Sequence, residues 1–183
     1  HQYCLIAWPC NKDLYGKIIN KARDEVANVI NEIAKTEQVI VLSNKEDINE
    51  IQNKTDHKNI DIIECKLDDS WMRDIAPIFY KEDEKLKSIS FEFNGYGKYP
   101  DYLNDNKISK FISNYLNIPT KISDLVIEGG AITYDDKKNL FSTKNVIFNK
   151  NRKQKHNSEY IIKELKLLFD LNYIFLFENG LME

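Results

Sequence analysis

The feature that most constrains the fold of this chain is the alternation of short β-branched runs with amphipathic segments. Apolar residues recur at three- and four-residue steps through residues 14–35, which predicts a long helix with one buried face. Further helices are expected at 45–54, 105–116 and 158–169. The helix at 45–54 would be capped by Ser43 or Asn44, and the helix at 158–169 by Asn157 or Ser158. Strands are expected at 3–8, 39–42, 60–65, 76–80, 87–93, 125–127, 131–134, 140–142, 146–148 and 173–177. Strands that come singly or in pairs with helices between them indicate an α/β or α+β protein.

Composition narrows the class of protein. The chain has 183 residues, of which 42% are hydrophobic, and this is enough for one domain with a core. The net charge is −3 and no basic block stands out, so nucleic acid is not an expected partner. The longest N-terminal apolar stretch, residues 4–8, is too short to cross a membrane, so no membrane partner is expected either.

Cysteine and histidine usage indicates neither a disulfide framework nor a metal site. Cys4, Cys10 and Cys65 form an odd set without CxxC spacing, which fits a reducing cytoplasm. Each is interpreted as a small core residue rather than a nucleophile. The three histidines are scattered and none has metal-ligand spacing with a cysteine or carboxylate, so no metal is expected.

The densest cluster of chemical groups is the run DDSWMRD at residues 68–74, directly after a predicted strand. Asp74 with either Asp68 or Asp69 could contact a planar guanidinium, because its N–H fork matches a carboxylate. Trp71 could cover the flat face of the cation or an alkyl chain. The alternative is a surface ion pair made by the arginine beside a core tryptophan, and the residues alone favour that simpler interpretation.

Three other segments are candidates for a site. Glu128 precedes two glycines, which would let the backbone approach a ligand beside the carboxylate, or would simply form a turn with an exposed glutamate. The Gly- and Tyr-rich loop at 94–100 could line a pocket or be a turn. The segment 149–152, which ends in Arg152, is most simply a solvated loop.

The order of these motifs resembles a known family. Trp8-Pro9, DDSWMRD at 68–74 followed by Pro77, FNG at 93–95 followed by Gly97-Lys98, EGGAI at 128–132 and NKNR at 149–152 occur in that sequence. In this order the chain resembles the agmatine deiminase and Porphyromonas-type peptidylarginine deiminase family of the pentein, or guanidino-group-modifying, superfamily. The resemblance extends over residues 1–183. It favours a functional site over the simpler interpretation both for the run at 68–74 and for the segment that begins at Glu128.

The resemblance implies an α/β-propeller built from five ββαβ-type modules, of which about three would be present. Residues 1–183 would then form a single incomplete domain whose C-terminal modules are missing, and an oligomer or a second chain could complete the propeller. It also implies cofactor-free hydrolysis of a guanidinium to a ureido group and ammonia. A cysteine thiolate would form a thiouronium intermediate, with a histidine as general acid and base.

Site residues carry over from the family by motif position. Asp74 would grip the guanidinium nitrogens, and Glu128 would lie beside the catalytic histidine and orient it. Trp71 would pack on the substrate. Asp68, Asp69 and Arg152 complete the set of residues expected to bind the substrate.

The chain also departs from the family pattern. The catalytic histidine, in a Gly-His-Val/Ile-Asp-like motif, is expected just after the last residues, and the nucleophilic cysteine far later. We therefore expect no turnover by this chain alone. A shortened insertion after Trp8-Pro9 weakens the agmatine assignment, but closer resemblance ranks agmatine, and with it putrescine and polyamine synthesis, ahead of peptidyl arginine. Three hypotheses remain: part of a deiminase, a non-catalytic guanidinium-binding module, or a remnant completed by another chain.

Overall fold

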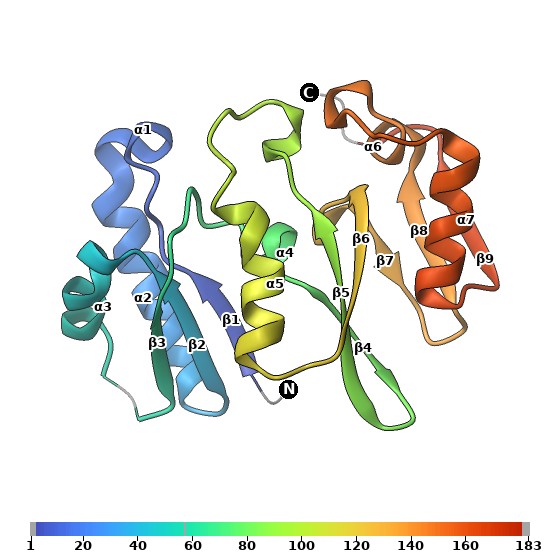
Figure 1. Cartoon of the computed structure of the whole chain (residues 1–183). Coiled ribbons are helices and arrows are strands. Elements are labelled where there is room, and N and C mark those ends of the chain that lie inside the picture. Colours follow the sequence, from blue (N-terminus) through green and yellow to red (C-terminus); the bar gives the residue numbers. More distant parts are fainter. Residues whose placement is uncertain (1–2, 57, 181–183) are drawn as a thin grey trace. The chain divides into compact units, whose positions relative to one another are not determined.

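The computed structural model describes residues 3–56 and 58–180, which form an α/β protein as predicted (Figure 1). The chain divides between Met72 and Arg73 into two compact units. The first unit contains one three-stranded sheet and the second contains two. None of the helices in the described ranges combines the length and the apolar character needed to cross a membrane.

The sheet of the first unit is entirely parallel. Its strands are β1 (Tyr3–Ala7), β2 (Gln38–Ser43) and β3 (Ile60–Glu64), in that order. Parallel neighbours need crossover connections, and helices supply them here. The first crossover contains α1 (Lys12–Tyr15), the 3-10 turn η1 (Gly16–Ile18) and α2 (Ile19–Ala34), and the second contains η2 (Lys45–Asp47) and α3 (Ile48–Lys54).

The core of the first unit explains the Trp8-Pro9 motif. Trp8 is fully buried in one cluster with α2 and the β2 residues Val39 and Val41. The Pro9 carbonyl accepts a hydrogen bond of 2.9 Å from Nε of Arg23, a buried residue of α2. The same guanidinium forms a 2.8 Å ion pair with Asp47. This motif therefore links the end of β1 to α2 and, through Arg23, to η2.

The second unit contains two copies of a ββαβ module. The first copy contains β4 (Ile78–Glu82), β5 (Lys85–Glu92), α5 (Asp105–Tyr115) and β6 (Thr120–Val126). The second contains β7 (Thr133–Tyr134), β8 (Asn139–Thr143), α7 (Ser158–Phe169) and β9 (Tyr173–Phe177). In each copy an antiparallel hairpin is extended by a parallel third strand. The module type implied by the resemblance is thus present in two sheets, while the sheet of the first unit has the order βαβαβ.

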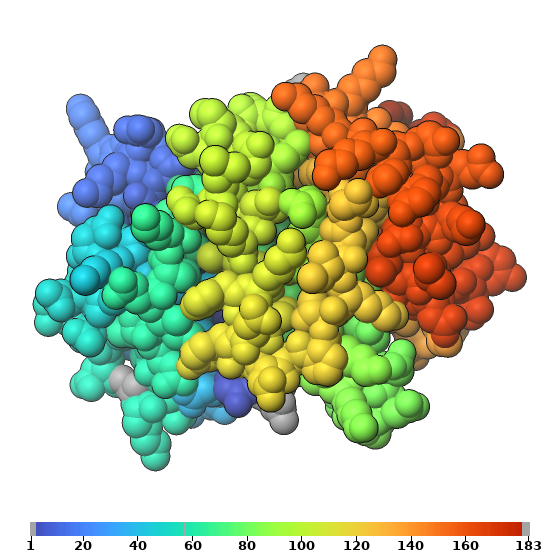
Figure 2. All heavy atoms as spheres, in the orientation of Figure 1, coloured from blue at the N-terminus to red at the C-terminus, as the bar shows by residue number. Residues whose placement is uncertain are grey.

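Helix α7 packs on both sheets of the second unit. On the β4-β5-β6 sheet, Ser88 faces α5 with its hydroxyl 3.0 Å from that of Ser113, while Ile89 points the opposite way. Ile89 belongs to one core cluster with the α7 residues Leu165 and Phe169 and with residues of the β7-β8-β9 sheet. In Figure 1 α7 lies in front of this last sheet, and in the same orientation its orange-red atoms form the visible surface in Figure 2. The residues of β9 that point away from this core, Tyr173, Phe175 and Phe177, are exposed.

Short elements connect these modules and carry most of the candidate site. They are α4 (Met72–Ile75), η3 (Gly95–Gly97), η4 (Gly129–Ala131), α6 (Lys144–Ile147) and η5 (Lys150–Arg152). The strand predicted at 146–148 is wrong, because this stretch contains the end of α6. Its β-branched residues favour a strand, but the helical turn buries Ile147 in the core.

The structure also decides between the predicted caps. Asn157 caps α7, since its side chain accepts a hydrogen bond of 2.9 Å from the amide of Tyr160. Neither Ser43 nor Asn44 caps the helical segment that follows β2. The Asn44 side chain instead pairs with the backbone of Leu67, accepting from its N–H at 2.9 Å and donating to its carbonyl at 3.2 Å. A long-range contact has replaced the local one.

Candidate functional site

Asp74 lies in α4 and its half-buried carboxylate is held from both sides. The Tyr96 hydroxyl donates to Oδ2 at 2.7 Å, and the Gly130 amide donates to Oδ1 at 3.0 Å. Each carboxylate oxygen can accept about two hydrogen bonds, so each keeps acceptor capacity beyond these contacts. Hydrogen bonds to an ionised carboxylate are stronger than neutral ones, and the pair defines the orientation of this group.

The two glycines after Glu128 permit the backbone to approach Asp74. A Cβ atom at Gly130 would lie 2.4 Å from Asp74 Oδ1, and one at Gly129 would lie 2.3 Å from the carbonyl oxygen of Arg73. Both distances are shorter than any side chain tolerates. From the sequence these glycines are expected to let the backbone approach a ligand; in the structure the group that they approach is the 73–74 segment.

Glu128 is a buried and paired carboxylate. It is 2% exposed, and Nε of Arg152 donates to its two oxygens at 3.1 and 3.0 Å. The Arg152 side chain is itself only 11% exposed. A buried charge needs such a partner, because unpaired burial is costly. The interpretation of an exposed glutamate in a turn is therefore wrong. In the segment 149–152, Lys150 and Asn151 are exposed as expected of a solvated loop, but the Arg152 side chain is not.

The loop at 94–97 joins these two carboxylates into one cluster. Gly95, Tyr96 and Gly97 have φ values of +64°, +59° and +68°. A Cβ atom at Gly97 would lie 2.0 Å from the carbonyl oxygen of Asn151, so this backbone rests directly on η5. The Asn94 side chain donates to the Arg152 carbonyl at 2.8 Å. One end of the loop thus contacts the partner of Glu128, and Tyr96 contacts Asp74.

The cluster brings together Asp74, Glu128 and Arg152 from the set of predicted site residues. It adds Tyr96, which lies in the Gly- and Tyr-rich loop singled out from the sequence but was not among the predicted site residues. The signal that could have found it is the glycine on either side of an aromatic residue, because flanking glycines allow a backbone conformation that other residues avoid.

Asp68, Asp69 and Trp71 belong to the first unit, in the loop that follows β3. Asp69 Oδ2 accepts from the Trp71 indole at 2.8 Å, and Oδ1 accepts from the Ser70 amide at 2.8 Å. The Trp71 side chain is anchored by this bond, yet Trp71 is 49% exposed. The alternative of a core tryptophan at this position is wrong, whereas Trp8 is the buried one.

Burial raises the pKa of the Asp69 carboxyl, and the hydrogen bonds from Ser70 and Trp71 oppose that shift only in part. We expect Trp71 fluorescence to change with pH at a midpoint above the ordinary aspartate value of about 3.9. Since the folded pKa is raised, the stabilising contribution of this group is present at low pH and is lost as pH rises through the folded value. A fluorescence titration checks this prediction.

Two variants make this titration specific. Asp69→Asn and Trp71→Phe should each remove the fluorescence step, while the buried Trp8 continues to emit in both. A step that persists unchanged in Asp69→Asn would show that another group is responsible.

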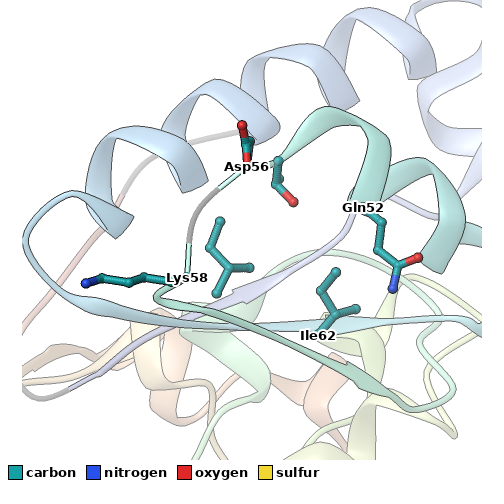
Figure 3. Close-up of a pocket in the computed structure, with 6 residues that line it drawn as sticks. Gln52, Asp56, Lys58 and Ile62 are labelled. Atoms are coloured by element: carbon teal, nitrogen blue, oxygen red, sulfur yellow. The ribbon is translucent and has the colours of Figure 1, made fainter.

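A separate hollow of about 510 Å³ lies in the first unit, beside α3 and β3 (Figure 3). Ile60 and Ile62 line it together with polar residues including Gln52, Asp56 and Lys58. Figure 3 shows Lys58 extending away from the other two labelled polar side chains. Small-molecule sites have a few polar groups that converge on the ligand. The labelled polar side chains of this hollow do not converge in this way.

No group of three His, Cys, Asp or Glu side chains within residues 3–56 and 58–180 is arranged to hold a metal ion. The cluster around Asp74 contains oriented carboxylates, a phenol, a guanidinium and backbone amides. Such carboxylates recognise a planar cation by charge and hydrogen-bond geometry.

Solved structures show which fold this chain shares. The fold matches an agmatine deiminase of Enterococcus faecalis with a TM-score of 0.90 at 18% identity, covering 98% of this chain and 51% of that one. It matches a C. jejuni agmatine deiminase variant with substrate bound with a TM-score of 0.87 at 24% identity, covering 100% and 54%. The fold is therefore that of about half of a pentein agmatine deiminase.

The family follows from the sequence comparison. Residues 1–183 match the Porphyromonas-type peptidyl-arginine deiminase family, and the chain belongs to that family. A Mycoplasma capricolum protein, provisionally named an agmatine deiminase, is 33% identical over 172 residues, covering 91% of this chain and 47% of its own length. The agmatine deiminase of Medicago truncatula is 28% identical over 196 residues, covering 99% and 52%. The chain thus spans about half the length of the curated relatives it matches.

Proposed function

We propose that the cluster around Asp74 binds a guanidinium group as part of an agmatine deiminase-like hydrolase. The observation that carries this proposal is the Asp74 carboxylate, oriented by Tyr96 and Gly130 with acceptor capacity left on both oxygens. A guanidinium presents parallel N–H donors that match two carboxylate oxygens. Membership of the deiminase family points to the same class of ligand.

Glu128 has a different role in this proposal. Its charge is already balanced by Arg152, so it is suited to orient neighbouring groups rather than to grip the substrate. Arg152 in turn acts through Glu128 and through its own backbone contact with Asn94. Trp71, whose ring is exposed and anchored by Asp69, is suited to stack on the cation, and Asp68 adds negative charge nearby in the sequence.

The proposed reaction hydrolyses agmatine to N-carbamoylputrescine and ammonia. A thiolate adds to the guanidinium carbon, ammonia leaves, and water then cleaves the thiouronium to release the ureido product and the thiol. The thiol and the histidine would come from the half of the relatives that this chain does not match. Cys4 is poorly suited to the task, because burial raises the pKa of its thiol and disfavours the thiolate.

Asp74→Asn tests the proposal directly. We expect agmatine binding to weaken by about 1.5–3 kcal/mol, because a charged hydrogen-bond acceptor is lost. Isothermal titration calorimetry on the purified chain measures this. Asp136→Asn, which removes a carboxylate from an exposed turn, is the matched control and should bind agmatine as the unmodified chain does. Equal affinity of the Asp74 variant and the unmodified chain would refute the proposal.

A peptidyl-arginine deiminase is the second candidate, since the matching family carries that description. Agmatine and a peptidyl arginine share the guanidinium end and differ at the other end. Titration with an acylated arginine amide beside agmatine separates the two candidates. Tighter binding of the arginine derivative would favour the second candidate, and tighter binding of agmatine would favour the first.

A further inference from the structure

We propose that Tyr96 is a specificity-determining residue, which makes the Asp74 carboxylate prefer a planar guanidinium over a primary ammonium. This inference rests on the proposed function and deepens it. It starts from the 2.7 Å hydrogen bond of the Tyr96 hydroxyl to Asp74, a contact between residues of η3 and α4.

The backbone at Tyr96 adopts an unfavourable conformation. Its φ of +59° lies in the left-handed region, which non-glycine residues avoid, and glycines with positive φ flank it on both sides. Such a conformation persists only where the surrounding structure imposes it, and it is frequent at functional sites. Here the conformation directs the phenol toward Asp74.

Neighbouring rings hold the phenol in place. The Phe93 ring meets the Tyr96 ring edge-on with centroids 5.1 Å apart, and the Tyr99 ring meets it similarly at 6.1 Å. Phe93 is buried, so one side of this arrangement belongs to the core. The hydroxyl therefore has a defined position, which a free side chain would lack.

The loop that carries Tyr96 is anchored at its backbone as well. Gly97 rests against the Asn151 carbonyl, and the Asn94 side chain donates to the Arg152 carbonyl. Arg152 is fixed by its ion pair with buried Glu128. The position of the hydroxyl thus depends on a buried charge pair and not on the exposed end of a loop.

The consequence for Asp74 is a carboxylate that cannot turn freely. Rotation about its Cβ–Cγ bond would break the hydrogen bond from Tyr96 on one oxygen and that from Gly130 on the other. A guanidinium gains from two oxygens held in one plane, because it donates two parallel hydrogen bonds. An ammonium is a compact charge that is satisfied in many orientations. Fixing the carboxylate therefore favours agmatine over an alkyl diamine.

Tyr96→Phe tests this by calorimetric titration of the chain with agmatine and with putrescine. We expect agmatine affinity to fall about fivefold to tenfold, as for loss of one ordinary hydrogen bond, and putrescine affinity to change less than about twofold. The ratio of the two affinities is the readout, since a merely structural role would weaken both ligands together. Tyr115→Phe removes a hydroxyl from an exposed ring of α5 and should leave both affinities unchanged.

A second variant alters the surroundings of Oδ1, the other oxygen of the Asp74 carboxylate. In Gly130→Ala the new methyl group would press on Asp74 Oδ1, so the affinity ratio should fall here too, with the fold checked by circular dichroism. If Asp74→Asn abolishes binding while the ratio stays constant in both variants, the inference about Tyr96 is wrong and the proposed function stands. If the unmodified chain binds neither ligand, or Asp74→Asn changes nothing, the proposed function fails and the inference fails with it.

Discussion

Arg152→Leu should lower the free energy of unfolding of the second unit by about 3–5 kcal/mol. The substitution leaves the Glu128 carboxylate buried without the guanidinium that now donates to both of its oxygens. A buried charge without a partner is among the few causes of losses this large. Urea denaturation followed by circular dichroism measures the effect.

Two comparisons separate this charge effect from loss of packing. Lys150→Leu alters an exposed residue of the same 3-10 turn and should stay within about 0.5 kcal/mol. The double variant Glu128→Leu/Arg152→Leu removes both charges and should recover much of the loss, because an apolar pair can replace a buried ion pair. A double variant that loses the sum of the single losses would contradict the coupling of these two residues.

Gly97→Ala should cost about 2–5 kcal/mol, the second large effect. Two causes add: a φ of +68°, which is unfavourable for alanine, and a Cβ atom 2.0 Å from the Asn151 carbonyl oxygen. Because that oxygen belongs to the backbone, η3 and η5 must move apart. Thermal unfolding measures the stability loss, and agmatine titration should show weaker binding since Tyr96 moves with Gly97.

Gly16→Ala is the control for the dihedral angle alone. Gly16 also has a positive φ, +51°, but a Cβ atom there would meet nothing within 4 Å. We expect a loss of about 1–3 kcal/mol, because a φ of +51° with a ψ of −129° is a backbone conformation that favours glycine. Equal losses at the two positions would mean that the contact between Gly97 and Asn151 does not constrain the site.

The periodicity of apolar residues predicted most of the secondary structure within a few residues. The long helix expected at 14–35 is present, but it is divided at Gly16, where positive φ interrupts the helical backbone between α1 and α2. The one wrong strand, at 146–148, shows the limit of local preference. The backbone of α6 forms a helical turn because this conformation buries Ile147. Burial here outweighs the preference of β-branched residues for strands.

The candidate site was predictable as a set of segments and not as a set of contacts. Carboxylates, glycines and an arginine in a fixed order pointed to Asp74, Glu128 and Arg152. The neutralisation of Glu128 by Arg152 could not be inferred, since the two residues are separated by 24 positions. Tyr96 was missed because its function depends on a backbone conformation and on a carboxylate 22 positions away.

By itself the sequence determined which stretches form helices and strands, which family the chain resembles, and which residue types could recognise a guanidinium. These follow from local periodicity and from the chemistry of single side chains. Only the tertiary structure decided that the backbone of Gly130 and the hydroxyl of Tyr96 hold Asp74, and that Glu128 is buried with a partner. The physical reason is that orientation, burial and charge pairing arise between segments that packing brings together, and no local pattern encodes those distances.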